Sequence, residues 1–337
     1  MPSPDPTDPP APSAAAAAWT APPRPDRADG ERRRVGVEIE FGELPVEAAS
    51  RAVHRRFGGR LSFDGPHRGF VEGARFGDFA VEIDMRFAHR AASTETERRL
   101  RDAVVGLSST LVPAEIVCPP IPWDEAHALD DLVADLRALG AEGTKEGLFW
   151  AFGAQLNPEP PSLETPHLIE TLRAFVILRE WLRAEIDVDT VRRISFFAAP
   201  FPDGYCAQIL QPDYAPAFPR FADDYLAANA SRDRELDVLP LLKHLDCDRV
   251  IAALPNEKVN ARPTWHYRLP NSEVERSDWS IGLEWDRWVR VERLAARPDL
   301  LREAATEWLR NYHSLVPRDW TPRAREIAGA LACASDR

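Results

Sequence analysis

The stretch RRRVGVEIEF, residues 32–41, decides the fold because it is the first part of the chain with the pattern of a half-buried strand. Its apolar residues recur with a period of two, at Val35, Val37, Ile39 and Phe41. Side chains two residues apart on a strand lie about 7 Å apart on the same face, from a rise of roughly 3.3 Å per residue. Glu38 and Glu40 are therefore predicted to project together from a polar face.

Composition narrows the class of protein. The chain has 337 residues, 44% of them apolar, and a net charge of -12, which opposes binding to nucleic acid or to an anionic membrane surface. No run approaches the roughly 20 apolar residues of a membrane helix. The four cysteines are scattered without a C-x-x-C pair, so neither a disulfide framework nor a thiolate zinc site is indicated. We expect a cytoplasmic protein without nucleic-acid or membrane partners.

The order of predicted elements indicates an α+β fold with a mainly antiparallel sheet. Residues 1–33, rich in Pro and Ala, are predicted to be a disordered tail, residues 34–320 one domain, and residues 321–337 a C-terminal tail. Hydrophobic periodicity and capping signals predict helices at 46–57, 94–107, 123–140, 166–184, 221–245 and 283–313. Strands are predicted at 34–41, 79–86, 114–118, 148–157 and, in short pieces, at 193–209.

Further acidic side chains accumulate on the predicted strands. Glu82 and Asp84 lie two apart in FAVEIDMR, and Glu115 lies in AEIVCPP. If these strands neighbour residues 34–41, the carboxylates share one surface, where like charges cost free energy unless a cation lies among them. Hard oxygen ligands select magnesium, manganese or calcium. The alternative is that these are ordinary solvent-facing positions of amphipathic strands, and the pattern leaves both interpretations open.

Later segments add polar and basic groups. Gln155 and Asn157 lie two apart in FGAQLNPE, although turn chemistry before PEPP explains them equally well. RPTWHYRLPN places His266 and Arg268 on one face of a strand, and the planar fork of arginine suits a phosphate or carboxylate. A structural salt bridge is the alternative for Arg268. The phosphate-binding loop, the dinucleotide fingerprint and the zinc-protease motif are absent from the sequence.

Five motifs in order give the chain a resemblance to a known family. GVEIEF, VEIDMR, AEIVCPPIP, GAEGTKEGLFWAFGAQLNPE and RPTWHYRLPNSEV resemble the motifs of the amidoligases, in the carboxylate-amine ligase group. That group is similar in fold to glutamine synthetase and glutamate-cysteine ligase. The resemblance implies a curved, mainly antiparallel sheet with helices packed on its outer face, whose concave face binds ATP and divalent metals.

The resemblance also implies residue roles. The metal ligands would be Glu38, Glu40, Glu82, Asp84 and Glu115. Residues implied at the cofactor are Glu40, Gln155, Asn157, His266 and Arg268, and those implied in catalysis are Glu38, Glu115 and Arg268. One position departs from the family, which has His where this chain has Gln155. Glutamine accepts a hydrogen bond but does not titrate near neutral pH.

The activity that follows from the resemblance is ATP-dependent joining of a carboxylate to an amine through an acyl phosphate, with Mg²⁺ or Mn²⁺. The partners would be small-molecule or peptide carboxylates and amines, and homo-oligomers are left open. Two alternatives stay open, a catalytically silent protein that binds a nucleotide or an amino acid, and a metal-dependent amide hydrolase. Metal ions bridge phosphate oxygens and neutralise the developing charge, and the clustered carboxylates would hold these metal ions.

Overall fold

The computed structural model describes residues 19–83, 113–143, 152–187 and 198–332. Contacts between Cα atoms divide the chain into two compact units, whereas the sequence predicts one domain over residues 34–320. Unit 1 comprises Met1–Trp19, Arg34–Gln155 and Asn271–Leu283. Unit 2 comprises Thr20–Arg33, Leu156–Pro270 and Glu284–Arg337.

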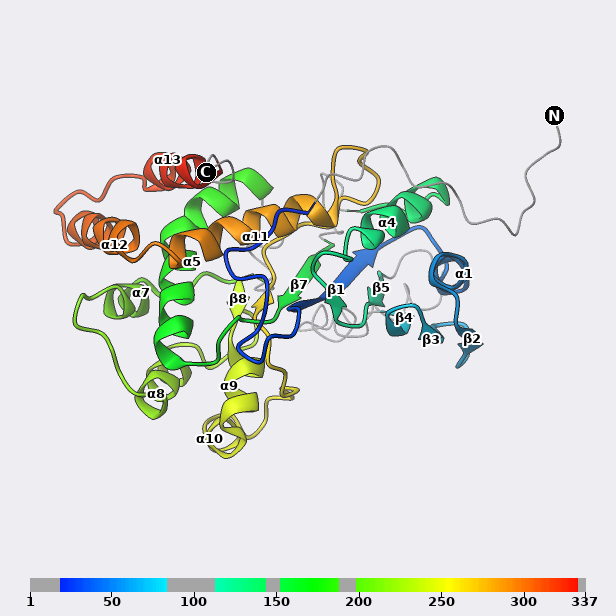
Figure 1. Cartoon of the computed structure of the whole chain (residues 1–337), viewed down its shortest axis with the longest axis horizontal. Coiled ribbons are helices and arrows are strands. Elements are labelled where there is room, and N and C mark those ends of the chain that lie inside the picture. Colours follow the sequence, from blue (N-terminus) through cyan, green and yellow to red (C-terminus); the bar gives the residue numbers. More distant parts are fainter. Residues whose placement is uncertain (1–18, 84–112, 144–151, 188–197, 333–337) are drawn as a thin grey trace, which may run out of the picture. The chain divides into compact units, whose positions relative to one another are not determined.

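Unit 1 is built on antiparallel strands in the order β2-β3-β4-β5-β1, and the short β6 also pairs with β1 (Figure 1). The strands are β1 (Arg34–Phe41), β2 (Arg60–Phe63), β3 (Arg68–Ala74), β4 (Gly77–Ile83), β5 (Ala114–Val117) and β6 (Ile121–Pro122). Every second residue of β1 is buried, including Val37, Ile39 and Phe41, whose exposed fraction is 0%. The alternation that the sequence predicts is confirmed.

Helices α1 (Val46–Phe57) and α4 (Ala128–Ala138) contact each other, and α1 covers the apolar face of the sheet. The ring of Phe57 stacks on that of Phe79, with centroids 5.1 Å apart. The close approach of α1 depends on Gly69 in β3, because a Cβ atom there would lie 2.2 Å from the hydroxyl oxygen of Ser50. Helix α1 ends at Phe57, and the next residue, Gly58, has a positive φ of 71° and donates from its backbone N–H to the carbonyl oxygen of His54.

Unit 2 is mainly helical. Its helices are α5 (Thr165–Ile186), α7 (Asp203–Ile209), α8 (Phe218–Ala228), α9 (Leu239–Leu245), α10 (Cys247–Ala253), most of α11 (Ile281–Ala295), α12 (Pro298–Tyr312) and α13 (Thr321–Ala332). Its strands are β8 (Leu236–Asp237), β9 (His266–Tyr267) and the second part of β7 (Ala154–Pro158), paired antiparallel in the order β7-β9-β8.

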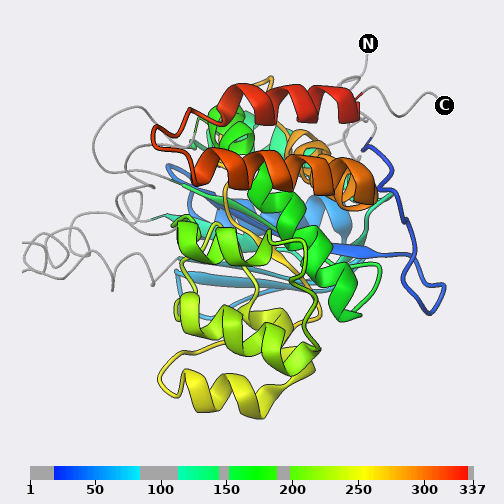
Figure 2. The same ribbon diagram turned by 90° about the vertical axis from the view of Figure 1, so that its left-hand side faces the viewer.

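The core of unit 2 lies around α5, which is buried along most of its length. The Tyr267 ring of β9 packs against Phe175 of α5 and Trp288 of α11, with centroids 6.2 Å and 5.5 Å apart. Helices α12 and α13 both contact α5 and run side by side over it (Figure 2). Since the Tyr267 side chain faces α5 and α11, the side chain of its neighbour His266 projects from the opposite face of β9.

Several predicted elements are confirmed and others are not. All strand ladders among the described residues are antiparallel and helices cover the apolar face of unit 1, so an α+β fold with a mainly antiparallel sheet is confirmed. Residues 203–209 form helix α7, not the predicted strand. The C-terminal segment contains α13, which packs on α5. The helix predicted at 94–107 lies outside the described residues. None of the described helices combines the length and the apolar character needed to cross a membrane.

Ordered structure begins before Arg34, so the predicted disordered tail of residues 1–33 is too long. Arg33 is 1% exposed and binds Glu292 of α11 through both terminal nitrogens, at 2.8 Å and 2.5 Å. Its Nε donates to the carbonyl oxygen of Glu159 at 2.7 Å, and Trp288 donates to the same Glu292 carboxylate. A proline-rich composition disfavours a core of its own, but here a buried, bidentate ion pair fixes the segment to unit 2.

We expect Arg33→Met to lower the free energy of unfolding by about 3 to 5 kcal/mol, because it leaves the buried Glu292 carboxylate without its partner. The measurement is denaturant-induced unfolding followed by circular dichroism. The matched control is Arg32→Met, whose ion pair with Asp26 has side chains 43% and 46% exposed and should contribute only about 0 to 1 kcal/mol. Equal effects of the two substitutions would contradict a special role for the buried pair.

Candidate functional site

The polar face of unit 1 aligns three carboxylates in one row. Glu40 of β1 lies directly opposite Glu115 of β5, and Glu115 lies directly opposite Glu82 of β4. Residues directly opposite one another in an antiparallel pair have Cβ atoms about 4.5 to 5.5 Å apart. All three side chains are partly exposed. We call Glu40, Glu115 and Glu82 the acidic row; the register brings them to one surface, with β5 lying between β4 and β1.

Glu38 extends the acidic face along β1, two residues before Glu40. The nearby Cys118 is buried, and its backbone N–H donates to the carbonyl oxygen of Val37 at 2.8 Å. Burial, and then the negative charges of Glu38 and Glu115, raise the pKa of the Cys118 thiol. The thiol thus stays protonated at neutral pH, chiefly because it is buried and in smaller part because of the two carboxylates from neighbouring strands.

Each end of the acidic row has a partner that offsets its charge. At the β4 end, Arg68 of β3 lies opposite Glu82 and forms an ion pair with it at 2.9 Å. At the β1 end, Oε2 of Glu40 accepts a hydrogen bond of 2.6 Å from the backbone N–H of Gly153. The Glu40 N–H in turn donates to the Gly153 carbonyl oxygen at 3.0 Å. These contacts fix both end carboxylates on the polar face.

The donor chemistry of the acidic row and Glu38 fits a hard divalent cation, because carboxylate oxygens are the ligands that magnesium and manganese prefer. In the part of the chain that the structure describes, no group of three or more His, Cys, Asp or Glu side chains is gathered as a metal site. Asp84, the fifth predicted ligand, lies outside the described residues. The register brings the carboxylates to one face, and the cation remains a proposal.

Gln155 and Asn157 both belong to β7, so they occupy strand positions on one face and not a turn. Gln155 is partly exposed and Asn157 is 3% exposed. The backbone just before β7 bonds to β1 through Gly153, and Ser272 donates from its N–H to the carbonyl oxygen of Phe152 at 3.0 Å. The strand interpretation of these two side chains is confirmed, while their contact with a cofactor stays a prediction.

The basic residues lie on β9 and the segment after it, in unit 2. His266 is 4% exposed and lies opposite Asp237 of β8, which is 0% exposed. Arg268 is partly exposed, and its guanidinium donates to the carbonyl oxygen of Arg232 at 3.0 Å. Asp237 Oδ2 lies 3.9 Å from Nε of Arg232. We call Arg232, Asp237, His266 and Arg268 the β8–β9 cluster.

Burial raises the pKa of Asp237 to about 6, against the opposing charge of Arg268, the hydrogen bond from the Leu239 N–H and the charge of Arg232. Asp237 and Arg232 are not among the residues that the sequence predicts for the site. Their segment, RDRELD at residues 232–237, mixes charges of both signs without apolar alternation, which is typical of a solvated loop. The one feature of this segment that points to a site is its alternation of basic and acidic residues, Arg232, Asp233, Arg234 and Glu235.

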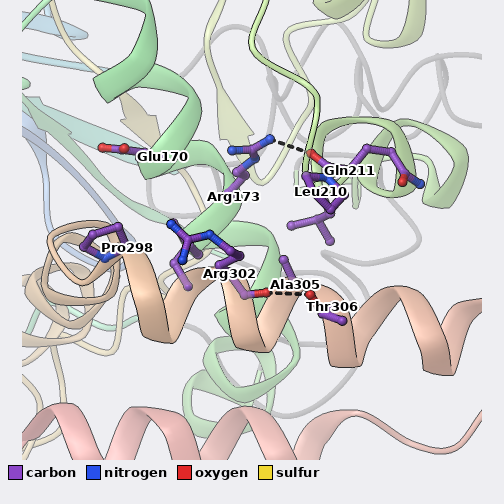
Figure 3. A pocket seen from close by; sticks show the side chains of 10 residues that line it. Glu170, Arg173, Leu210, Gln211, Pro298, Arg302, Ala305 and Thr306 are labelled. Atoms are coloured by element: carbon purple, nitrogen blue, oxygen red, sulfur yellow. Dashed lines mark hydrogen bonds between the residues drawn. The ribbon is translucent and has the colours of Figure 1, made fainter.

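Two of the described pockets lie away from these residues. A cavity of about 110 Å³ between α5 and α12 is lined by Glu170, Arg173 and Arg302, among others (Figure 3). Arg173 is already committed there, because it donates to the carbonyl oxygens of Ile209, Gln211 and Tyr214. A cavity of about 610 Å³ in unit 1 is lined by the start of α1 and by Phe63 and His67. Neither cavity is lined by a residue that the sequence assigns to the site.

We expect Glu115→Gln to raise the free energy of unfolding by about 0.5 to 1 kcal/mol, because it removes the central charge from a row of three opposed carboxylates. The measurement is denaturant unfolding of the protein without added divalent cations. Glu72→Gln is the control, since Glu72 lies on the same face of β3 and is paired with Arg60, so its loss should be neutral or slightly destabilising. A destabilising effect of Glu115→Gln would contradict mutual repulsion in the row.

Comparison with known proteins gives one match. A family model described as "Putative amidoligase enzyme" matches residues 31–290, which is 260 of the 337 residues. The matched range includes the acidic row, β7 and the β8–β9 cluster. Searches of curated proteins and of solved structures returned no match.

Proposed function

Since the chain belongs to the amidoligase family, we propose that it is an ATP-dependent ligase that joins a carboxylate to an amine. The substrates would be an amino acid, a peptide or a related small molecule. In water the equilibrium favours hydrolysis of an amide over its formation, so joining a carboxylate to an amine needs an activated acyl group. Transfer of the γ-phosphoryl group of ATP to the carboxylate would give an acyl phosphate and ADP, and the amine would then displace phosphate.

The single observation that carries this proposal is the register of the acidic row, with Glu40 opposite Glu115 and Glu115 opposite Glu82. On an ordinary solvent-facing sheet surface, three directly opposed like charges are not expected, because like charges opposite one another destabilise the pairing of strands. A cation between them would reverse the sign of that interaction. Magnesium or manganese would neutralise charge on the phosphate oxygens of ATP when bound there.

The residues of unit 1 have distinct proposed roles. Glu38, Glu40, Glu82 and Glu115, with Asp84 beyond the described residues, would hold the cation. The ion pair with Arg68 and the hydrogen bond from Gly153 keep Glu82 and Glu40 in place, so that the row need not rearrange when the cation binds. The attacking amine must lose a proton, and a carboxylate of this face, Glu38 or Glu115, would accept it.

The β7 and unit 2 residues would contact the cofactor. The Arg268 guanidinium suits phosphate oxygens of the nucleotide or of the acyl phosphate, because a charge-assisted hydrogen bond from arginine is directional and strong. His266, Gln155 and Asn157 are proposed to contact the nucleotide. Gln155 offers an amide oxygen and nitrogen in a place where the family has a histidine, so proton transfer at this position is not available.

The proposal predicts magnesium-dependent release of ADP when purified protein is given ATP with panels of amino acids and peptides as acids and amines. Glu38→Gln should reduce this release at least about a hundredfold, because it removes a charged oxygen ligand from the acidic face. Glu72→Gln, on the same face of the neighbouring strand β3 and already paired with Arg60, should retain wild-type activity and serves as the control. Wild-type turnover in Glu38→Gln would contradict the role of Glu38.

A second candidate function is a catalytically silent protein that binds a nucleotide or an amino acid, and Gln155 is the observation that favours it. Under this alternative the wild type binds a non-hydrolysable ATP analogue but releases no ADP, and Gln155→His gains turnover because an imidazole titrates near neutral pH. Calorimetric titration and the ADP assay on both proteins separate the candidates. Turnover by the wild type equal to that of Gln155→His would exclude the silent alternative.

A further inference from the structure

The segment before β8 places charged side chains beside Arg268 although its sequence gives no periodic signal. Arg268 donates from its backbone N–H to the carbonyl oxygen of Glu235 and from its guanidinium to that of Arg232, both at 3.0 Å. Asp237 lies in the same segment and opposite His266. Residues 232–237 are thereby held along one side of the strand that carries His266 and Arg268.

Asp237 is a buried carboxylate with one oxygen that makes no hydrogen bond. Its Oδ1 accepts a hydrogen bond of 2.9 Å from the Leu239 N–H at the start of α9. Its Oδ2 is fully buried and has no hydrogen-bond partner among the described residues. Burying such a group is costly unless charges nearby compensate for the lost hydration. The two cations that lower its pKa are Arg268 and Arg232.

The separation of Asp237 from Arg232 differs from that of a structural ion pair in the same unit. Arg33 and Glu292 are in bidentate contact at 2.8 Å and 2.5 Å, whereas Arg232 Nε stays 3.9 Å from Asp237 Oδ2. The Arg232 side chain is 21% exposed and is tethered by donation from its NH1 to the Lys258 carbonyl oxygen at 2.7 Å. Its guanidinium is thus held near the carboxylate without being enclosed by it.

Two guanidinium groups near one another repel, and a buried negative charge that attracts both reduces this repulsion. Asp237 therefore allows Arg232 and Arg268 to remain on the same side of β9, each anchored to a backbone carbonyl oxygen. Because both arginine side chains stay partly exposed, the cluster presents cations toward solvent over a buried carboxylate. Such an arrangement suits a tetrahedral dianion, to which arginine bonds through its planar fork.

We propose that Arg232 joins Arg268 as the second cation of an anion site, and that Asp237 is a positioning residue that holds the two guanidinium groups. The site would take a phosphoryl-sized dianion. Its assignment to the phosphates of ATP or to an acyl phosphate rests on the proposed function, whereas the site itself rests on the geometry of the β8–β9 cluster.

The charge of Asp237 gives this site a pH dependence of known sign. Its pKa of about 6 means that the carboxylate is ionised at pH 8 and largely neutral at pH 5. Protonation removes a negative charge beside Arg232 and Arg268, so affinity for a dianion should rise as the pH falls through about 6. The titratable and charged groups that face Asp237 are Arg232 and Asp233 before β8, His266 and Arg268 on β9 and after it, and Tyr225 of α8.

The first measurement is calorimetric titration of the full-length protein with sodium sulfate at pH 7.5, and separately with a non-hydrolysable ATP analogue and magnesium. We expect Arg232→Gln and Arg268→Gln each to weaken sulfate binding by about ten- to a hundredfold, the usual effect of losing a charge-assisted hydrogen bond. The control is Arg302→Gln on α12, an exposed arginine paired with Asp299, which should bind sulfate as the wild type does. Circular dichroism confirms that each variant is folded.

The second measurement tests whether Asp237 lies close enough to act on the bound anion through its charge, as its positioning role requires; a purely structural residue would not change this readout. Sulfate keeps its double charge between pH 5 and pH 8, so the pH dependence of its affinity reports the protein. In the wild type, affinity should rise as the pH falls through 6, and Asp237→Asn should remove the part of this rise that Asp237 causes.

The outcomes separate this inference from the proposed function. Sulfate binding that depends on both arginines, without binding of the ATP analogue, supports the anion site and overturns the nucleotide assignment. Binding of the ATP analogue that is unchanged in Arg232→Gln overturns the inference and leaves the ligase proposal in place. Absence of sulfate binding by the wild type, or an unchanged pH profile in Asp237→Asn, likewise overturns the anion site or the positioning role, respectively.

Discussion

Strand β1 can bury only one of its two faces, and the organisation of unit 1 depends on which one it buries. Val37, Ile39 and Phe41 are fully enclosed, so Glu38 and Glu40 must face the other way. A slip of one residue in the pairing with β5 would move this whole apolar set to the polar side. Burial of the apolar set therefore excludes a slip of one residue, and the observed register places Glu40 opposite Glu115.

The same register brings three like charges into one row, which by itself opposes the pairing of the strands. Arg68 compensates Glu82, and the Gly153 N–H compensates Glu40, but both act at the ends of the row. Three aligned carboxylates are a poor solution for stability alone, because neutral β-branched or aromatic residues pair better across strands. Sites of this kind, where a local rule is broken without a structural gain, are where function is expected. The acidic row is therefore consistent with the cation that we propose there.

Sequence periodicity predicted which side chains share a face of the sheet, but not which residues lie opposite one another on neighbouring strands. A period of two identifies which side Glu40, Glu82 and Glu115 share, whereas their direct opposition depends on hydrogen-bond register, which no single strand encodes. The ion pair between Arg68 and Glu82 could not be predicted for the same reason, because it depends on the register between β3 and β4. Composition misled at the N-terminus, since the prolines before Arg33 indicate disorder and the single buried ion pair with Glu292 outweighs them. Residues 203–209 were misassigned because a helix of seven residues is too short for a clear 3.6-residue period.

Two arginine–carboxylate pairs in unit 2 differ in the separation of their charged groups, and the two pairs interact differently as a result. In contact, Arg33 and Glu292 satisfy each other's hydrogen bonds and contribute to holding the chain before β1. At 3.9 Å, Asp237 and Arg232 attract each other without the short contact that joins Arg33 to Glu292, and a guanidinium NH of Arg232 donates to the carbonyl oxygen of Lys258. A buried carboxylate left with an unsatisfied oxygen destabilises the fold unless neighbouring cations are held close. The charges of Asp237 and of the two arginines therefore stabilise one another inside unit 2.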